Sequence, residues 1–191
     1  MAGSGMGKAR SGMGVVAAVL LLASCDKKSG TGPKLVYTGP LMETTNVLTL
    51  FSDSARLKLK LTAPLEQQFE NGDVLYPKGM VVTFYDRDGK TVVNTLTAKY
   101  GKVEKATSLY IMRGDVRVVN EPKQQKMFTE ELFFDKTKQK IYTKPEMQVR
   151  VITPFEMLTG TGFTANQDFS YYRLAHPTGS FAPPDKGNGG F

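Results

Sequence analysis

Cys25 is the only cysteine in the 191-residue chain, and it lies in a chemically distinctive segment. Two basic residues, Lys8 and Arg10, precede an uninterrupted apolar run from Val15 to Leu22, and the small residues Ala23 and Ser24 follow it. A basic segment, a short apolar segment and small residues, in this order, are typical of a cleaved secretion signal. The apolar run is far shorter than the roughly 18 to 20 residues that a membrane-spanning helix requires. We therefore expect an exported chain that is cleaved next to Cys25.

The string Leu22-Ala23-Ser24-Cys25 resembles the lipobox of bacterial lipoproteins. That resemblance implies diacylglycerol transfer to the Cys25 sulfur, cleavage before Cys25 and acylation of the new amino terminus. Two or three acyl chains would hold the domain firmly to a membrane. The alternative is an ordinary cleaved signal followed by an incidental cysteine. Removal of residues 1–24 would leave 167 residues, and the loss of Lys8 and Arg10 would lower the net charge from +7 to +5.

Other residues that could support catalysis lack the partners they would need. His176 is the only histidine, so a zinc site or a Ser-His-Asp triad has no complete set of residues. The carboxylate pairs Asp86 with Asp88 and Glu130 with Glu131 show no sign of a shared cleft, and no phosphate-binding glycine loop is present. We therefore expect no enzyme activity, no catalytic residue, no metal and no cofactor. The pI of about 9.4 raises the question of nucleic acid, but an exported protein would rarely meet it.

Composition divides the chain into four parts. Residues 1–24 form the expected lipoprotein signal peptide, and residues 25–40 form a lipidated flexible linker that begins with a polar, glycine-containing stretch. Residues 41–181 are dense in strand signals and form one domain. The final segment, 182–191, has the composition of a flexible tail.

Period-two alternation predicts an all-β domain. In Ala55–Leu61, Leu57, Leu59 and Leu61 face one side, and Arg56, Lys58 and Lys60 face the other. Val81–Tyr85 and Thr91–Val93 predict a hairpin, with Asp88-Gly89 at its turn. Pro64–Gln68 gives a weak signal for a helical turn. Further strands are expected at Ser108–Met112, Val116–Val119, Lys140–Thr143, Met147–Ile152 and Phe169–Leu174.

A recurrence runs through these strands. Thr97, Thr129 and Thr159 each follow a large apolar residue and precede an aromatic residue, at spacings of 32 and 30 residues. Such spacing predicts a stacked or repetitive β architecture in which no unit closes its own core. Chance similarity between β-meanders is the alternative.

Together these segments resemble LptC, the periplasmic component of lipopolysaccharide export, and more broadly the OstA-like domain family. The resemblance covers roughly Phe51–Gly179, and the order and spacing of the segments are more specific than any one of them. It implies a twisted antiparallel β-jellyroll, open along one side, that holds lipid A acyl chains. It also implies that lipid passes from an inner-membrane ABC transporter to an LptA-like jellyroll. The segments are Leu96–Tyr100, Met112–Val118, Thr129–Asp135, Lys140–Thr143 and Thr159–Ser170.

A site for acyl chains needs a continuous apolar lining, because the chains carry no directional groups. Ordinary core packing would produce the same alternation, so each candidate retains that alternative. Basic residues such as Arg56, Arg113 and Arg117 could meet glycolipid phosphates, although a solvated strand face explains them equally. The expected lipid-binding residues are Leu57, Leu59, Leu61, Phe84, Ile111, Val116, Val118, Ile141, Met147 and Val149, with Val82 and Val151 as further inward positions.

The resemblance places the receiving carrier at the C-terminal edge, around Leu158–Leu174. Gly160 and Gly162 would allow close backbone approach there, beside Phe163, although both glycines could instead form a bulge. Asp26, directly after Cys25, resembles an inner-membrane retention signal, so we expect a lipid-anchored domain on the periplasmic face of the inner membrane. The alternative function is a scaffolding envelope lipoprotein with a filled core and no lipid transfer.

Overall fold

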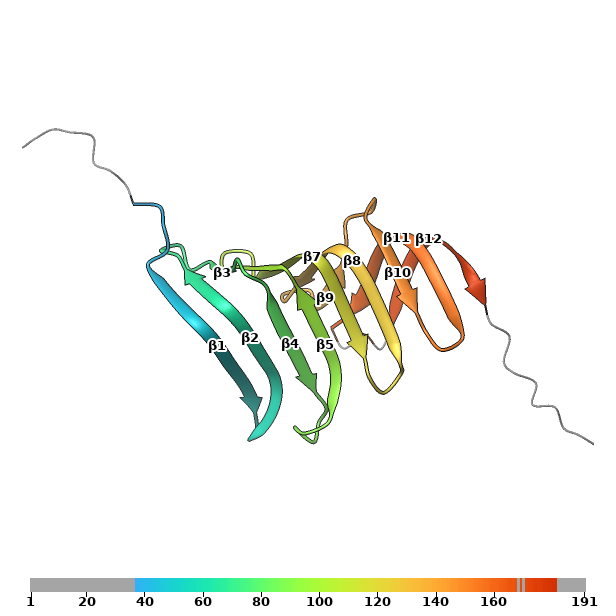
Figure 1. Cartoon of the computed structure of the whole chain (residues 1–191), viewed down its shortest axis with the longest axis horizontal. Helices are drawn as coiled ribbons and strands as arrows, with labels where there is room; N and C mark the ends of the chain where they lie inside the picture. Colours follow the sequence, from blue (N-terminus) through green and yellow to red (C-terminus); the bar gives the residue numbers. More distant parts are fainter. Residues whose placement is uncertain (1–36, 168, 170, 182–191) are drawn as a thin grey trace, which may run out of the picture. The chain divides into compact units, whose positions relative to one another are not determined.

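The computed structural model describes residues 37–167, 169 and 171–181, and the twelve regular elements in these ranges are all β-strands (Figure 1). The expectation of an all-β domain is confirmed. Residues 1–36 and 182–191 lie outside the described residues, and they include the expected signal peptide, Cys25 and the tail. Residues from Thr38 onward form one compact unit. The strands are β1 (Met42–Asp53), β2 (Arg56–Gln68), β3 (Val74–Tyr76), β4 (Met80–Tyr85), β5 (Val92–Ala98), β6 (Tyr100–Glu104), β7 (Leu109–Asn120), β8 (Gln125–Asp135), β9 (Lys140–Tyr142), β10 (Gln148–Ile152), β11 (Glu156–Asn166) and β12 (Tyr172–Phe181).

All twelve strands belong to one antiparallel sheet that folds back on itself. The longest strands change neighbours along their length, which makes this folding possible. β7 pairs with β6 over Leu109–Arg113 and with β5 over Arg117–Asn120. β8 likewise pairs with β10 in its first half and with β9 in its second half. The two resulting layers share long strands, as in the expected β-jellyroll, and do not form a stack of separate repeat units.

The three recurring threonines do not occupy equivalent positions in the sheet. Thr97 and Thr159 lie in the same cross-strand row as Arg117 and Arg150, whereas Thr129 is buried and pairs with Val116 and Val149. The recurrence falls on β5, β8 and β11, which β7 and β10 separate within one continuous sheet, and a stack of separate repeat units is not observed in the described residues.

The hairpin between β4 and β5 forms as the sequence predicts. Gly89 has a φ of 70°, the positive value that its turn requires. The Asp88 carboxylate accepts hydrogen bonds from the Thr91 hydroxyl and from the backbone N–H groups of Lys90 and Thr91, at 2.5, 2.8 and 2.9 Å. These bonds, led by the one from the Thr91 side chain, lower the pKa of Asp88 to about 2.

The prediction of a helical turn at Pro64–Gln68 is wrong, because this segment completes β2. Proline cannot donate a hydrogen bond to a neighbouring strand, so its position in the ladder matters. Pairing of β2 with β4 ends at Thr62, and pairing of β2 with β3 begins at Gln67. Pro64 lies between them, where no described strand pairs with that side of β2, so its missing N–H interrupts no ladder there.

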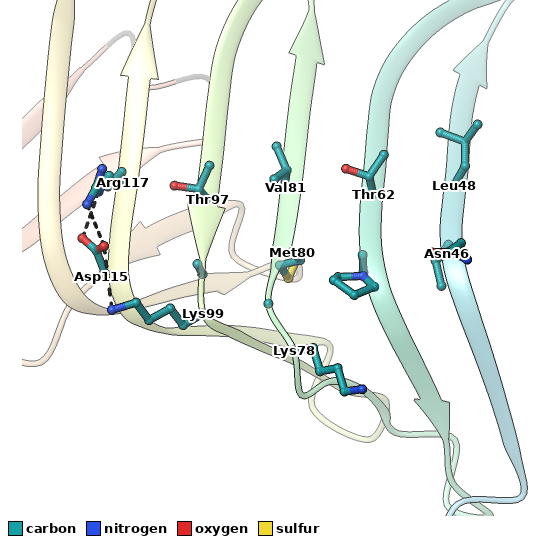
Figure 2. Close-up of a pocket in the computed structure, with 15 residues that line it drawn as sticks. Asn46, Leu48, Thr62, Lys78, Met80, Val81, Thr97, Lys99, Asp115 and Arg117 are labelled. Carbon is teal, nitrogen blue, oxygen red and sulfur yellow. Dashed lines mark hydrogen bonds and ion pairs between the residues drawn. The ribbon is translucent and has the colours of Figure 1, made fainter.

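The broad layer consists of β1, β2, β4, β5 and β10 with the parts of β7, β8 and β11 that pair with β5 and β10, and it has one buried face and one exposed face. Ala63, Met80 and Ala98 belong to the buried cluster. Their chain neighbours Thr62, Val81 and Thr97 lie side by side on the opposite face, in one cross-strand row (Figure 2). Leu132, Val116 and Val149 are the largest fully buried side chains of the described residues, so the centre of the core lies between β7, β8 and β10.

Two leucine substitutions test this assignment of the core. We expect Leu132→Ala to lower the free energy of unfolding by about 2 to 5 kcal/mol, because it leaves a cavity in a fully buried position. Leu50 is 58% exposed on β1. We expect Leu50→Ala to change the free energy of unfolding by less than about 0.5 kcal/mol. Urea denaturation of the two variants measures both values, and equal losses would contradict the assignment.

Candidate functional site

The apolar interior between the two layers is the candidate site. Residues directly opposite each other on paired strands lie on the same face of a sheet. One such row crosses the broad layer with an apolar side chain on each of β2, β4, β5, β7, β8, β10 and β11. The row consists of Leu61, Val82, Leu96, Val118, Met127, Val151 and Leu158, and its members from Val82 to Val151 are at most 6% exposed.

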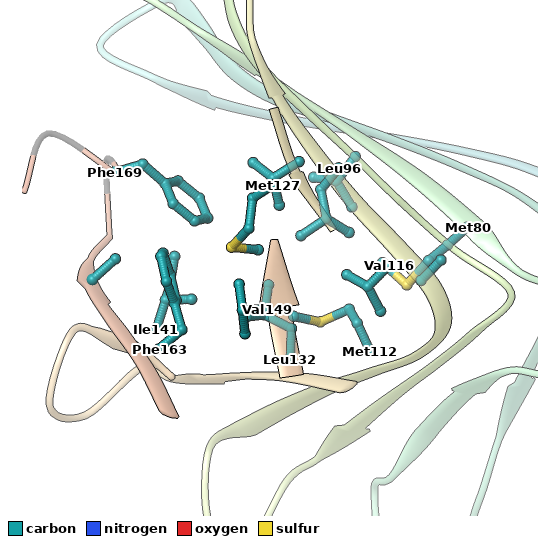
Figure 3. Close-up of a cluster of buried hydrophobic side chains, with 14 of the residues drawn as sticks. Met80, Leu96, Met112, Val116, Met127, Leu132, Ile141, Val149, Phe163 and Phe169 are labelled. Atoms are coloured by element: carbon teal, nitrogen blue, oxygen red, sulfur yellow. The ribbon is translucent and has the colours of Figure 1, made fainter. Parts of the chain in front are cut away.

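The second layer closes over this row. Met112 and Leu132 come from the halves of β7 and β8 that pair with β6 and β9, and Ile141 comes from β9 itself. Phe163 of β11 and Phe169, which follows it, complete the cover, and Phe163 stacks on Tyr172 with ring centroids 5.8 Å apart. Figure 3 shows Met112, Leu132 and Val149 close together, with Phe169 and Phe163 at one side of the cluster. In this structure, apolar side chains fill the interior.

The β1–β2 end of the interior is less closed. Val47, Leu59 and Leu61 are only partly buried against the cluster, and Phe51 at the end of β1 is 60% exposed. β1 pairs with β2 alone, so this end of the apolar surface lacks cover from a further described strand. The interior therefore changes from tightly packed near β8 to partly exposed near β1.

Most of the residues expected to line the interior lie in or against the cluster. Val116, Val118, Ile141 and Val149 are buried members of it. Leu59, Leu61 and Phe84 pack against it from partly buried positions. Leu57 and Met147 are half-buried and lie outside the cluster, and Met147 precedes β10 instead of belonging to it. Binding of lipid by any of these residues stays a prediction.

The prediction that Ile111 faces the same interior is wrong. Ile111 is buried, but it lies outside the cluster, in a hollow on the other side of the sheet that Phe69, Leu75 and Arg113 also line. Ile111 lies five residues before Val116, so strict alternation already places the two on opposite faces, and the bulge of β7 between Arg113 and Val116 does not reverse this. Gly114 and Asp115 occupy the bulge with φ values of 74° and 48°.

The residues expected at the docking edge do not lie at an edge. β11 pairs with β10 and β9 on one side and with β12 on the other. Phe163 is 2% exposed, and a side chain at Gly160 would collide with the Ala175 carbonyl at 2.6 Å. Gly162, with a φ of 61°, lies at a register shift between β11 and β12, so it forms the bulge that was the alternative. The C-terminal edge of the described sheet is therefore β12.

Sequence reasoning missed several central residues. Met80, Leu96, Met112, Met127 and Leu132 are at most 9% exposed in the cluster, but none was among the expected lining. In β8, the alternation of buried Met127 and Thr129 with more exposed neighbours could have identified Met127 as an inward residue. Leu132 is an odd number of residues from both, so the same alternation would wrongly place it on the outer face. The exposed edge strand β1 was also missed, because it combines apolar residues with Thr and Asn on both faces.

Polar groups inside the fold are paired. The Asn120 side-chain amide donates to the Asn94 Oδ1 at 2.9 Å, and both residues are buried at one margin of the interior. On the outer side, Glu131 is buried beneath Arg113 and Lys144, whose Nε and Nζ lie 2.5 and 2.7 Å from its two carboxylate oxygens. Burial alone raises the pKa of Glu131, but hydrogen bonds from Lys144 and Arg113 and their charges outweigh it, so the pKa is lowered.

This arrangement presents a continuous apolar surface. The described residues contain no group of three or more side chains placed to hold a metal ion. His176 is exposed on β12. Within the described ranges, no helix has the length and hydropathy needed to cross a membrane.

Comparison with known families agrees with this description. A family profile described as "Lipopolysaccharide-assembly, LptC-related" matches residues 41–176, which is most of the chain and nearly all of the described sheet. The chain therefore belongs to the LptC-related family, and it has a role in lipopolysaccharide transport. This family consists of periplasmic transport proteins that associate with the inner membrane, and it is not known for enzyme activity. A search of curated protein sequences found no significant match.

The lowered pKa of Glu131 predicts a pH-dependent contribution to stability. A carboxyl group with a lowered folded pKa stabilises the fold above its unfolded pKa, near 4.5, and loses that contribution as the pH falls through the folded value. We expect Glu131→Gln to lower the free energy of unfolding by about 1 to 2 kcal/mol at pH 7, since both cations are half exposed. The difference should vanish in acid.

The exposed neighbour Glu130 provides the control. We expect Glu130→Gln to change the free energy of unfolding by less than about 0.5 kcal/mol at pH 7. Urea titrations of both variants at several pH values give the comparison. A Glu131→Gln loss that persists unchanged in acid would contradict the ion-pair explanation.

Proposed function

We propose that the chain is a lipid carrier of the lipopolysaccharide export bridge, and that it holds lipid A acyl chains between its two layers. The lipid would arrive from an inner-membrane ABC transporter and leave to an LptA-like jellyroll. The observation that carries this proposal is the apolar row that crosses the sheet without a polar interruption from Leu61 to Leu158. An acyl chain moving along such a row meets no group that it would have to desolvate.

The filled state of the interior is compatible with lipid entry. An acyl chain that enters replaces contacts between apolar side chains with equivalent contacts to itself, so no apolar surface has to meet water. Met80, Met112 and Met127 lie in the cluster, and methionine adapts its shape more readily than branched side chains do. The partly exposed end at Phe51, Leu59 and Leu61 supplies a place where the layers can begin to separate.

A scaffolding envelope protein remains the second candidate. The observation in its favour is the dense centre, where Leu132 and Val116 have no exposed surface. In that case the same sheet would only join neighbouring proteins, and its interior would remain closed. The two candidates differ in whether lipid ever contacts the interior side chains.

The membrane attachment that we propose is an acyl anchor at Cys25, on the periplasmic face of the inner membrane. Support comes from the lipobox-like string that ends at Cys25 and from Asp26 after it. A membrane-bound position would keep the domain beside the transporter from which it collects lipid.

The two edge strands are the proposed docking positions. Among the described strands, β1 pairs only with β2 and β12 pairs only with β11, and the two strands lie at opposite ends of the sheet (Figure 1). An unpaired edge can add a strand from a neighbouring protein through main-chain hydrogen bonds. We assign the receiving jellyroll to β12 and the transporter side to β1, which aligns the apolar row with both neighbours.

Photocrosslinking at adjacent residues of β5 tests the carrier. Leu96 faces the interior and Thr97 faces the opposite side, so the pair shares a location and differs only in direction. We expect a photoreactive residue at Leu96 to form lipopolysaccharide adducts in living cells, and the same residue at Thr97 to form none. Adducts at neither position, in a folded and exported protein, would favour the scaffold.

A second crosslinking pair tests the docking edge. Thr178 lies on β12, and its direct partner Thr159 lies one strand further into the sheet. Both residues are exposed, so accessibility to solvent does not separate them. We expect protein adducts with a neighbouring jellyroll at Thr178 and much weaker adducts at Thr159. Equal yields, or adducts at Thr159 alone, would contradict docking through the β12 edge.

A further inference from the structure

The face of the broad layer opposite the apolar interior carries a shallow groove of about 820 Å³. Its floor contains Thr62, Val81 and Thr97 from three neighbouring strands, as Figure 2 shows. Longer side chains stand around this floor, including Lys78 and Lys99 at one side. The groove is therefore open, its floor is made of small side chains, and cations stand at its rim.

Cations recur along this face beyond the groove. We define the basic face by Lys60, Lys99, Arg117, Lys126 and Arg150. Arg117, Phe128 and Arg150 are direct partners in the cross-strand row that begins at Leu48 and Thr62. Lys60 and Lys126 lie in the next row on the same face. The cross-strand partners Thr83, Thr95 and Val119 link the two lysines across the sheet. The cations thus span the sheet from β2 to β10.

Few carboxylates neutralise these cations. Asp115 pairs with Arg117 at 2.7 Å and with Lys99 at 3.9 Å. Lys60 and Lys126 have no carboxylate partner among the described residues, and the Arg150 guanidinium lies over the Phe128 ring at 5.1 Å. The basic face therefore retains a positive charge that the fold itself does not use.

Exposed apolar side chains accompany the cations. Leu48 and Leu50 are 62% and 58% exposed, and they are the direct partners of Thr62 and Lys60. At the far end of the row that contains Lys126, Met157 is 46% exposed. Apolar groups of this size next to unpaired cations mark an interaction surface.

We propose that the basic face docks on the surface of a bilayer that contains anionic phospholipids. Mobile headgroups can neutralise scattered cations without a fixed pattern of hydrogen bonds, while Leu48, Leu50 and Met157 enter the interfacial region. An acidic protein partner fits less well, because the floor of the groove is made of small side chains and holds no buried polar group to orient a directional partner. The proposal concerns the face opposite the interior, so it stands independently of lipid transport.

Docking through this face has a geometric consequence. β1 and β12 lie at the margins of the sheet, so both edges stay free for neighbouring proteins while the face rests on the bilayer. The interior cluster then lies on the side of the broad layer that faces away from the membrane.

Vesicle sedimentation of an unanchored domain tests the proposal. A chain that begins at Thr38 retains every described strand and the whole buried cluster, so it keeps its own core without residues that could be acylated. We expect it to sediment with vesicles of phosphatidylcholine and phosphatidylglycerol at low salt, and to remain in solution with vesicles of phosphatidylcholine alone. High salt should release it.

Two charge-matched triple variants localise the binding. Each cation near an anionic bilayer is worth roughly a fivefold change in binding, so we expect Lys60→Glu/Lys126→Glu/Arg150→Glu to weaken vesicle binding by about 100-fold or more. The control Lys105→Glu/Lys136→Glu/Lys140→Glu changes three exposed lysines away from this face, and should weaken binding by less than about fivefold. Thermal unfolding of both variants verifies that each remains folded.

Three results would overturn the proposal. These are the absence of binding to the anionic vesicles, equal losses in the two folded triple variants, and equal binding to vesicles of phosphatidylcholine alone. If the basic-face variant is unfolded, the single variant Lys126→Glu at an exposed position replaces it, with Lys136→Glu as its control. A loss at Lys126 of about fivefold or more, without loss at Lys136, supports the proposal, and equal effects contradict it.

Discussion

Successive side chains of a strand point to opposite sides of a sheet, and the whole structure depends on how this sheet uses that alternation. Because all twelve described strands are joined in one folded ladder, the residues on one face meet in a common interior, while the other face carries most of the exposed side chains. Val82 and Val81 are neighbours in the chain, yet the first is 6% exposed and the second 38% exposed. A shift of one residue in the pairing would exchange the two environments, so register is the property that must be kept.

Period-two patterning predicts much of this fold correctly. It gives the hairpin at Asp88-Gly89, the inward direction of Val116, Val118 and Val149, and the half-buried leucines of β2. It fails where the parity of a strand changes, as in β8, where Met127 and Leu132 both lie in the interior although they are five residues apart. At Ile111, which is five residues from Val116, strict alternation agrees with the structure and contradicts the expected inward direction. The docking edge around Phe163 was expected from the family resemblance and not from alternation, and it is wrong because the pairing of a later strand, β12, decides whether β11 is an edge. Long-range pairing of this kind leaves no local signal in the sequence.

The dense interior fits the transport role of the family if lipid exchanges with side chains and does not enter an empty cavity. Separation of the layers near Leu132 without a lipid would expose apolar surface to water, which opposes opening. A bound acyl chain removes that cost because it covers the same surface. The chain would therefore open only while lipid is present, and it would close behind the lipid as the acyl chains move on.

Methyl NMR of the methionines tests most directly whether acyl chains reach the interior. Met80, Met112 and Met127 lie in the buried cluster, whereas Met42 is 50% exposed and lies outside the basic face, so one spectrum contains both the probes and a control. Addition of lipopolysaccharide with a spin label near the end of an acyl chain should broaden the signals of the three buried methyl groups and leave that of Met42 sharp. Broadening at Met42 without broadening of the three buried methyl groups would contradict the account, because it would place the acyl chains on the surface of a sheet that stays closed.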